Sequence, residues 1–370
     1  MQKHYRLNIV KHPFMRPVTR VLCLALIVIG LYLPSHVSSD TPTWDLETWA
    51  IPFDYSSPTQ AIKYQPLDTA SKKWRICASY PHLKDSYWLS VNYGMVEEAK
   101  RLGVALQVVE AGGYPNLQRQ INQITACSAN STDILIVGTV SFDGLSETIL
   151  QITENIPVVS VVNDIADPGI AAKVGVSWTT MSQIIGQHLA KLHPIGSPTI
   201  KVAWFPGPET SGWVPFVEKG FRSALRKSSA EIVVTKYGDT GKEIQLILIE
   251  EALEERPDID IIVGSAVTAE AAVSVLRDQQ LTEQIHILAD YYTHAVYRGI
   301  KRNRIIAAPT DFPVMQGRMG IEQAVRVLEG KLIVKHAGPA IKLVDIHNVD
   351  EIGSSESLAP AMFTPTFIVK

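Results

Sequence analysis

The chain has 370 residues, of which 46% are hydrophobic, and a formal net charge of −3 at pH 7. This length and apolar content suffice for two domains with separate hydrophobic cores. The near-neutral charge balance excludes a protein that binds nucleic acid through a strongly basic surface.

The first 39 residues have the pattern of a secretory signal peptide. Basic residues precede an apolar run at 21–33, and Val37 and Ser39 stand at the −3 and −1 positions of a cleavage site after Ser39. The run is shorter than the ~20 residues of a membrane-spanning helix, which favours cleavage over an uncleaved anchor. No cysteine stands at the junction, so a lipid anchor is not expected. We therefore expect export to the periplasm.

Residues 40–73 form a leader that carries several aromatic residues, and we expect it to pack on the body of the protein. Residues 74–332 then alternate short apolar strands with amphipathic helices. Continuous apolar runs are typical of parallel strands buried on both faces, and strand–helix alternation predicts βαβ units. The predicted strands are 74–80, 104–110, 134–137, 157–162, 173–176, 199–205, 231–237, 259–265 and 287–291.

Two α/β lobes follow from this pattern, each Rossmann-like with a parallel sheet, and a multi-strand hinge joins them. Turn-rich residues 193–198 mark one crossover, and residues 290–292 begin another. We assign 74–192 and about 291–332 to the first lobe. We assign 199–290 and about 333–370 to the second lobe and tail. A hinge between two lobes predicts closure around a small molecule.

Two cysteines, Cys77 and Cys127, remain once Cys23 leaves with the signal peptide. Both fall in the predicted first lobe, so a disulfide between them is geometrically possible in an oxidising compartment. Two buried, unpaired thiols fit the sequence equally well, and both alternatives stay open.

Aromatic residues concentrate in the loops that follow the strands. Ligands of open parallel sheets bind beyond the carboxyl ends of the strands, and turn-forming residues normally dominate there. Five such loops each carry at least one tyrosine or tryptophan, among them Tyr87, Trp88, Tyr114, Trp178, Trp213 and Tyr291. Their shared position predicts an aromatic cage at one edge of the lobes.

An aromatic cage binds cations through the ring quadrupole, and quaternary ammonium groups are its usual guests. Asp85 and Asp290 lie among the rings and suit a positive guest or a hydroxyl. The alternative guest is a sugar, whose C–H face also stacks on rings. Arginine is absent from these five loops, which weighs against a sugar and against a carboxylate ligand.

Other chemistries lack support in the sequence. No G-x-G-x-x-G, P-loop or G-x-S-x-G motif is present, and the histidines are scattered without zinc-ligand spacing. We therefore expect no enzyme, no cofactor and no metal. Asn163 and Asp164 follow a predicted strand and either reach the cleft or cap the next turn, and we favour the cap.

Residues 74–332 resemble periplasmic binding proteins of the ribose-binding type, which implies the type I fold. The resemblance rests on Tyr87 and Trp88 before a helix, on 156–159 before a polar pair, and on Gly220-Phe221 after a glycine-rich loop. Residues 299–303, which lead to a strand, and the late helix at 317–328 also fit. These features are typical of the fold and do not specify the ligand.

Within that family, the chain resembles the periplasmic sensors of trimethylamine N-oxide that act on a membrane-bound sensor histidine kinase. Residues 85–88, 112–116, 175–178 and 289–292 carry this resemblance, together with the leader. It implies capture of the N-oxide in the cleft and signalling to the kinase, which induces N-oxide respiration. It implies cage roles for Tyr87, Trp88, Tyr114, Trp178 and Tyr291 and a polar role for Asp85. Trp213 and Asp290 are added from loop position alone.

Two other functions remain as alternatives. The same fold serves the solute-binding subunits of sugar or osmolyte ABC transporters, and fold alone does not decide between transport and sensing. The second alternative is an exported α/β enzyme, but the catalytic motifs that such an enzyme needs are missing.

Overall fold

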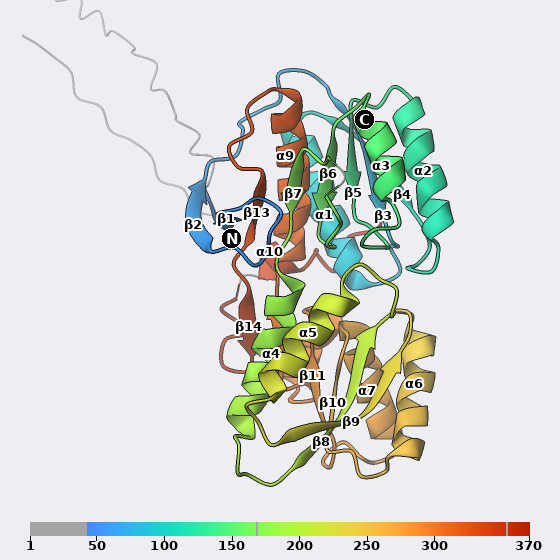
Figure 1. Cartoon of the computed structure of the whole chain (residues 1–370), viewed down its shortest axis with the longest axis vertical. Coiled ribbons are helices and arrows are strands. Elements are labelled where there is room, and N and C mark those ends of the chain that lie inside the picture. Colours follow the sequence, from blue (N-terminus) through green and yellow to red (C-terminus); the bar gives the residue numbers. More distant parts are fainter. Residues whose placement is uncertain (1–42, 168, 353) are drawn as a thin grey trace, which may run out of the picture. The chain divides into compact units, whose positions relative to one another are not determined.

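A computed structural model describes residues 43–370 except 168 and 353 (Figure 1). The signal peptide expected at 1–39 lies outside the described residues. Within the described ranges, no helix is long and apolar enough to cross a membrane.

The first lobe is built on a nine-stranded sheet. Its parallel strands run in the order β4 (Ala105–Glu110), β3 (Arg75–Tyr80), β5 (Ile134–Val137), β6 (Val158–Val161), β7 (Ala172–Val174) and β13 (His336–Pro339). Antiparallel β15 (Ile368–Val369) borders β4, and β1 (Trp44–Trp49) and β2 (Thr59–Tyr64) continue the sheet beyond β13. The order of β4, β3, β5, β6 and β7 is that of a doubly wound sheet, in which ligands bind where the strand order reverses.

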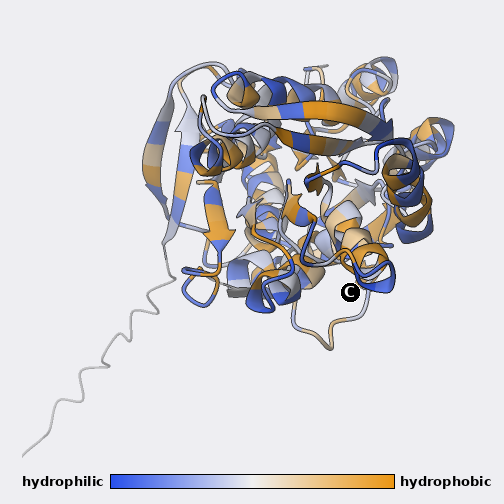
Figure 2. Ribbon diagram, turned by 90° about the horizontal axis from the view of Figure 1, so that it is seen from below, coloured by the Kyte–Doolittle hydropathy of each residue, from blue (hydrophilic) through white to orange (hydrophobic). Residues whose placement is uncertain are grey.

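Helices cover both faces of this sheet. Helices α1 (Ser86–Leu102) and α9 (Pro313–Leu328) pack together on one face, and α2 (Leu117–Ala129) and α3 (Ser146–Thr153) cover the other. The short α10 (Ser354–Ser357) contacts α9. Hydrophobic residues lie mainly on the interior strands, and hydrophilic ones along the outer loops and helices (Figure 2).

The second lobe repeats the same strand order on a smaller scale. Its parallel sheet runs β11 (His286–Ala289), β10 (Ile261–Gly264), β8 (Ile200–Gly207) and β9 (Ala230–Tyr237). Helices α4 (Trp178–Leu192) and α5 (Val214–Leu225) pack together, while α6 (Lys242–Glu255), α7 (Ala266–Asp278) and α8 (His294–Lys301) form a second group. The antiparallel pair β12 (Ala307–Thr310) and β14 (Lys342–Asp345) adjoins β11. The N–H of Ile306, just before β12, donates to the carbonyl of Ile287 in β11.

Three short connections carry the chain between the lobes: β7 to α4, β12 to α9, and β13 to β14. A longer segment after β14 returns the chain to the first lobe, where β15 pairs with β4, although the tail was expected in the second lobe. These positions differ from the predicted boundaries. Helix α4 was expected in the first lobe but packs on α5, and residues 193–198 form only the turn before β8. Strand β12 pairs in the second lobe and β13 in the first, the reverse of the expectation for each. Turn-rich composition marks a change of direction, whereas a crossover needs only two or three residues.

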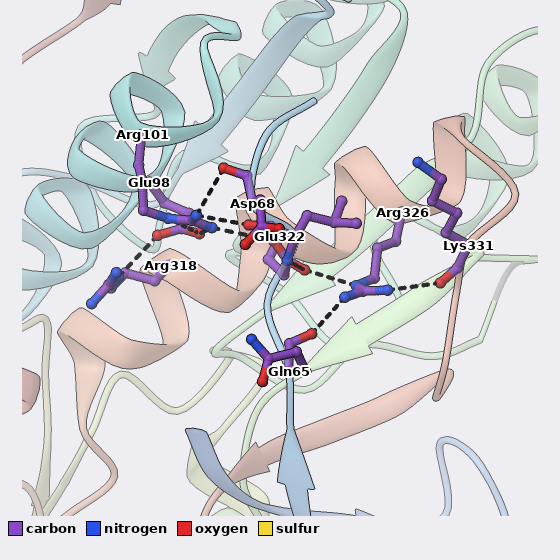
Figure 3. Close-up of polar contacts among 9 residues, drawn as sticks. Gln65, Asp68, Glu98, Arg101, Arg318, Glu322, Arg326 and Lys331 are labelled. Carbon is purple, nitrogen blue, oxygen red and sulfur yellow. Dashed lines mark hydrogen bonds and ion pairs between the residues drawn. The ribbon is translucent and has the colours of Figure 1, made fainter. Parts of the chain in front are cut away.

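The leader is bonded to the first lobe through a buried ion-pair network (Figure 3). Glu98 on α1 and Glu322 on α9 are both fully buried. Arg318 Nε donates to Glu98 at 3.0 Å, and Arg326 Nε donates to Glu322 at 2.7 Å. The backbone N–H of Leu67 also donates to Glu322, at 2.8 Å. Arg101 of α1 donates to the Leu67 carbonyl at 2.7 Å, so charged side chains of both helices bind the leader backbone directly.

The structure decides between a disulfide and two unpaired thiols. Cys77 on β3 and Cys127 in α2 form a disulfide, with their Cα atoms 6.2 Å apart. Both lie in a hydrophobic cluster beneath α2 and α3, on the face of the first sheet away from α1.

Candidate functional site

A small cavity lies where loops of the two lobes meet. Its lining consists of Asp85, Tyr87, Trp88, Tyr114, Asn163, Trp178, Trp213, Thr240 and Tyr291, which we call the cage. The first five come from the first lobe, Trp178 begins the helix after the first crossover, and the rest come from the second lobe. The cavity has a volume of about 10 Å³, room for about one water molecule, so a larger guest enters only if the lobes separate.

Helix α1 places two of the rings. Asp85 is its N-cap, and one carboxylate oxygen accepts from the backbone N–H groups of Tyr87 at 3.1 Å and Trp88 at 3.0 Å. This is the usual work of an N-cap aspartate, and it fixes both aromatic residues on the first helical turn. The polar role expected for Asp85 is therefore at least partly structural. Gly138 allows the Trp88 ring to lie against β5, since a Cβ there would come within 2.4 Å of the indole.

Tyr114 and Asn163 form a polar corner of the cage. The Asn163 side-chain amide donates to the Tyr114 hydroxyl at 3.2 Å and to the Thr139 carbonyl at 2.7 Å. Val162, just before Asn163, has a positive φ of 66°, which is rare for a β-branched residue and turns the chain sharply after β6. The preference for a capping role of Asn163 was wrong, because its side chain reaches the cavity.

The two tryptophans near the second lobe are fixed differently. Trp178 Nε1 donates to the Val162 carbonyl at 3.2 Å, which ties this ring to the first lobe. Trp213 Nε1 is buried and meets no acceptor with good hydrogen-bond geometry among the described residues, although it lies near enough to the Tyr114 hydroxyl to lower the pKa of that group. An indole N–H that lines a cavity without a partner is a donor available to a guest.

The rings contact one another around the cavity. The centroids of Tyr87 and Tyr291 are 5.3 Å apart, those of Trp178 and Trp213 are 5.4 Å apart, and those of Trp213 and Tyr291 are 6.3 Å apart. Most pairs meet edge to face, an arrangement that aromatic rings prefer. Burial raises the pKa of Tyr87, Tyr114 and Tyr291, so their hydroxyls stay protonated and able to donate.

Asp290 does not line the cavity. It is 1% exposed, neither carboxylate oxygen has a partner among the described residues, and burial raises its pKa well above the usual range. It precedes Tyr291 and raises the pKa of that hydroxyl.

Seven of the eight residues predicted from the sequence line the cavity, and Asp290 lies behind it. Thr240 was missed because it follows β9 in a loop without an aromatic residue. Its hydroxyl lies 3.2 Å from His82 Nε2, across the gap between the lobes. Its position after a strand was the only signal that pointed to it.

A wider cavity of about 570 Å³ adjoins the cage and shares Asp85 and Thr240 with it. Residues from both lobes line it, including Lys242 and Glu270, which form an ion pair at 3.0 Å. The wider cavity therefore borders the cage, and we call it the approach.

Residues 73–364 match the model of the family described as periplasmic binding proteins and sugar binding domain of LacI family. The periplasmic protein TorT of Escherichia coli K12 is 39% identical over 300 residues, which cover 80% of this chain and 85% of TorT.

Two solved structures are also similar. An ABC transporter solute binding protein from Bradyrhizobium sp. BTAi1 with bound Bis-Tris is 48% identical, with a TM-score of 0.76, and the match covers 88% of this chain and 98% of that one. A complex of the TorS sensor domain with TorT in the presence of TMAO matches at 40% identity and a TM-score of 0.74. That match covers 80% of this chain and 100% of the solved one.

Proposed function

Because the chain belongs to the family of periplasmic binding proteins and LacI-type sugar binding domains, we propose that it works by binding and not by catalysis. It captures trimethylamine N-oxide between its lobes in the periplasm and signals to a TorS-type sensor histidine kinase. The similarity to TorT and to the TorS–TorT complex supports this assignment over the fold alone.

One observation carries the ligand assignment: aromatic rings from both lobes surround a single small cavity. Trimethylamine N-oxide presents three methyl groups on a positive nitrogen, which suit ring faces, and each desolvated ring contributes roughly 0.5–2 kcal/mol. Its oxygen needs a donor, and the Trp213 N–H and the Tyr114 hydroxyl are available. A ligand of so few atoms has limited affinity, so a dissociation constant on the order of micromolar is expected.

Transport is the second candidate, and one finding favours it. The Bradyrhizobium protein, a solute binding protein of an ABC transporter, is more similar in sequence than TorT is to this chain. Bis-Tris is a tertiary amine with hydroxyl groups. An alkylated amine is therefore a ligand class that fits both the sensor and the transporter function.

The first test is calorimetric titration of the mature protein, residues 40–370, with trimethylamine N-oxide, Bis-Tris, glycine betaine and ribose. Saturable binding of the N-oxide in preference to the others supports the proposal, whereas preferential binding of ribose contradicts it. Capture of the protein by the immobilised sensor domain of a TorS-type kinase then separates sensing from transport. Failure of that capture, with and without N-oxide, supports the transporter reading.

A further inference from the structure

One cage ring is bonded to a connection between the lobes. The Tyr87 hydroxyl donates to Asp311 Oδ2 at 2.5 Å, and both side chains are buried. Asp311 lies between β12 in the second lobe and α9 in the first. It does not line the cavity, so it does not contact a guest there, and its hydrogen bond to Tyr87 connects it to the lining.

The position of Asp311 depends on the conformation of this connection. Gln316 Nε2 donates to the same carboxylate oxygen at 2.6 Å and to the Asp311 carbonyl at 2.9 Å. The next residue, Phe312, has φ 54° and ψ 65°, a left-handed conformation that is unusual for a residue other than glycine. The Phe312 N–H donates to Thr310 Oγ1 at 3.2 Å, which closes a tight turn around Asp311.

No ion pair neutralises Asp311 in the described part of the chain. Its hydrogen-bond donors, Tyr87 and Gln316, are neutral, and Oδ1 has no partner among the described residues. Lys342, the first residue of β14, brings a cation near this connection, with its Nζ 5.6 Å from the ring of Phe312. The other titratable groups that act on Tyr87 or on the adjoining Tyr291 are Tyr114, Asp85 and Asp290.

A phenol that donates to a carboxylate gains electron density, since hydrogen bonds in a chain polarise one another. A more negative ring face attracts a cation more strongly. We propose that Asp311 is a positioning residue which, when ionised, orients and polarises Tyr87, so that binding of a methylated-nitrogen ligand is linked to the protonation state of this inter-lobe connection. This inference rests on the proposed function, because it requires such a ligand in the cage.

Burial raises the pKa of Asp311 to about 6, against the opposing effect of its bonds from Tyr87 and Gln316. Ionised Asp311 favours the cationic guest, so the guest in turn lowers the pKa of Asp311. Affinity is therefore full at pH values above about 6 and declines as the pH falls through that value. One linked proton limits the decline to about tenfold per pH unit.

Tetramethylammonium is the probe, because its charge does not change with pH, whereas an N-oxide oxygen takes up a proton in acid. We would titrate wild type, Asp311→Asn, Tyr87→Phe and the double variant from about pH 5 to about pH 8, the range in which a carboxyl with a raised pKa changes charge. Wild-type affinity should fall several-fold toward the acid end. Asp311→Asn and Tyr87→Phe should each bind more weakly and without that slope, and the double variant should be no weaker than the worse single one.

Two further variants assign the slope to Asp311. Glu270→Gln removes a carboxylate of the approach that lies outside the cage, and the wild-type slope should persist. Asp290→Asn removes the other buried carboxyl near the rings, and the slope should persist there too. A flat profile in wild type that binds tetramethylammonium, or a slope kept by Asp311→Asn, overturns the inference alone. No binding of either tetramethylammonium or the N-oxide by wild type at neutral pH overturns the proposed function and the inference with it.

Discussion

At the scale of single residues, the cage divides into rings that surround a guest and donors that orient it. Trp178 belongs to the first group, because its indole N–H is already bonded to Val162 and only its ring faces the cavity. Trp178→Ala should therefore weaken N-oxide binding several-fold to about thirtyfold, the loss expected for one desolvated ring. Calorimetry checks this, with Trp74→Ala as the matched control, since Trp74 packs near Glu329, far from the cage. Equal N-oxide affinity of Trp178→Ala and wild type would contradict binding of the ligand in the cage.

Trp213 belongs to the second group. Its buried N–H makes no well-formed hydrogen bond among the described residues, so we expect it to donate to the oxygen of a bound N-oxide. Trp213→Phe keeps a ring but removes the donor, and should weaken N-oxide binding by about fivefold to tenfold, the loss expected for one neutral hydrogen bond. Tetramethylammonium has no oxygen, and its affinity should change much less. The ratio of the two affinities is the measurement, and a parallel loss for both ligands would show that Trp213 serves only as a ring.

The sequence predicts the rings well and the donors poorly, for a physical reason. A tryptophan or tyrosine in a turn is conspicuous because turn chemistry favours other residues. Asn163 is an ordinary residue for a turn, and Thr240 is a small side chain in an unremarkable loop, so composition does not distinguish either from a loop residue without a role. Whether Asn163 faces the cavity depends on the left-handed conformation of Val162, which sequence patterns do not reveal.

At the scale of elements, the leader is the feature that the family match does not cover, since that match begins at residue 73. Its strand β1 pairs with β13, the strand that leads into the third connection between the lobes. Thr48 Oγ1 donates to the His336 carbonyl at 2.7 Å, and the Phe53 N–H donates to His336 Nδ1 at 3.0 Å. The leader thus supports the hinge strand and is also bonded to α1 and α9.

The buried charges behind the leader allow a stability prediction. Arg326 is 6% exposed, and its Nε bonds the fully buried Glu322. Arg326→Met should lower the free energy of unfolding by about 3 kcal/mol, because the buried Glu322 carboxylate then loses its closest cation. Adding Glu322→Gln to that variant should recover part of the loss, since the uncompensated charge is then gone.

Urea denaturation measures these changes. Arg277→Met is the control, because Arg277 pairs with Asp278 on the surface, where an ion pair contributes little. A loss at Arg326 no larger than that at Arg277 would contradict the assigned role of the network.

The fold itself was largely predictable at this scale, whereas the lobe boundaries were not. Continuous apolar runs identify strands such as β5 to the residue, because both faces of the strand are buried. A helix pattern, however, does not say which of two sheets the helix packs on. Helix α4 follows β7 after three residues yet packs on α5, because its buried face matches α5 rather than the sheet it leaves.

At the scale of the whole described molecule, the cage is complete only when the lobes approach each other. Rings from both lobes line a cavity that holds about one water molecule, so the unliganded protein must open for a guest to enter. Three short connections set the axis of that motion, which is the hinge closure typical of two-lobed binding proteins. If the free protein in solution populates open forms, saturating N-oxide should shift them toward the closed form and so reduce the radius of gyration in small-angle X-ray scattering.

The N-oxide is also an excluded osmolyte that favours compact states without binding a site. Trp178→Ala at the same N-oxide concentration separates the two effects, because it retains the osmolyte effect and loses cage binding. Compaction in wild type that the variant does not share is specific closure, and this is the change that a kinase in contact with both lobes would sense. Equal compaction in both proteins would mean that the ligand does not bring the lobes together, and signalling would then have to depend on a local change around the cage.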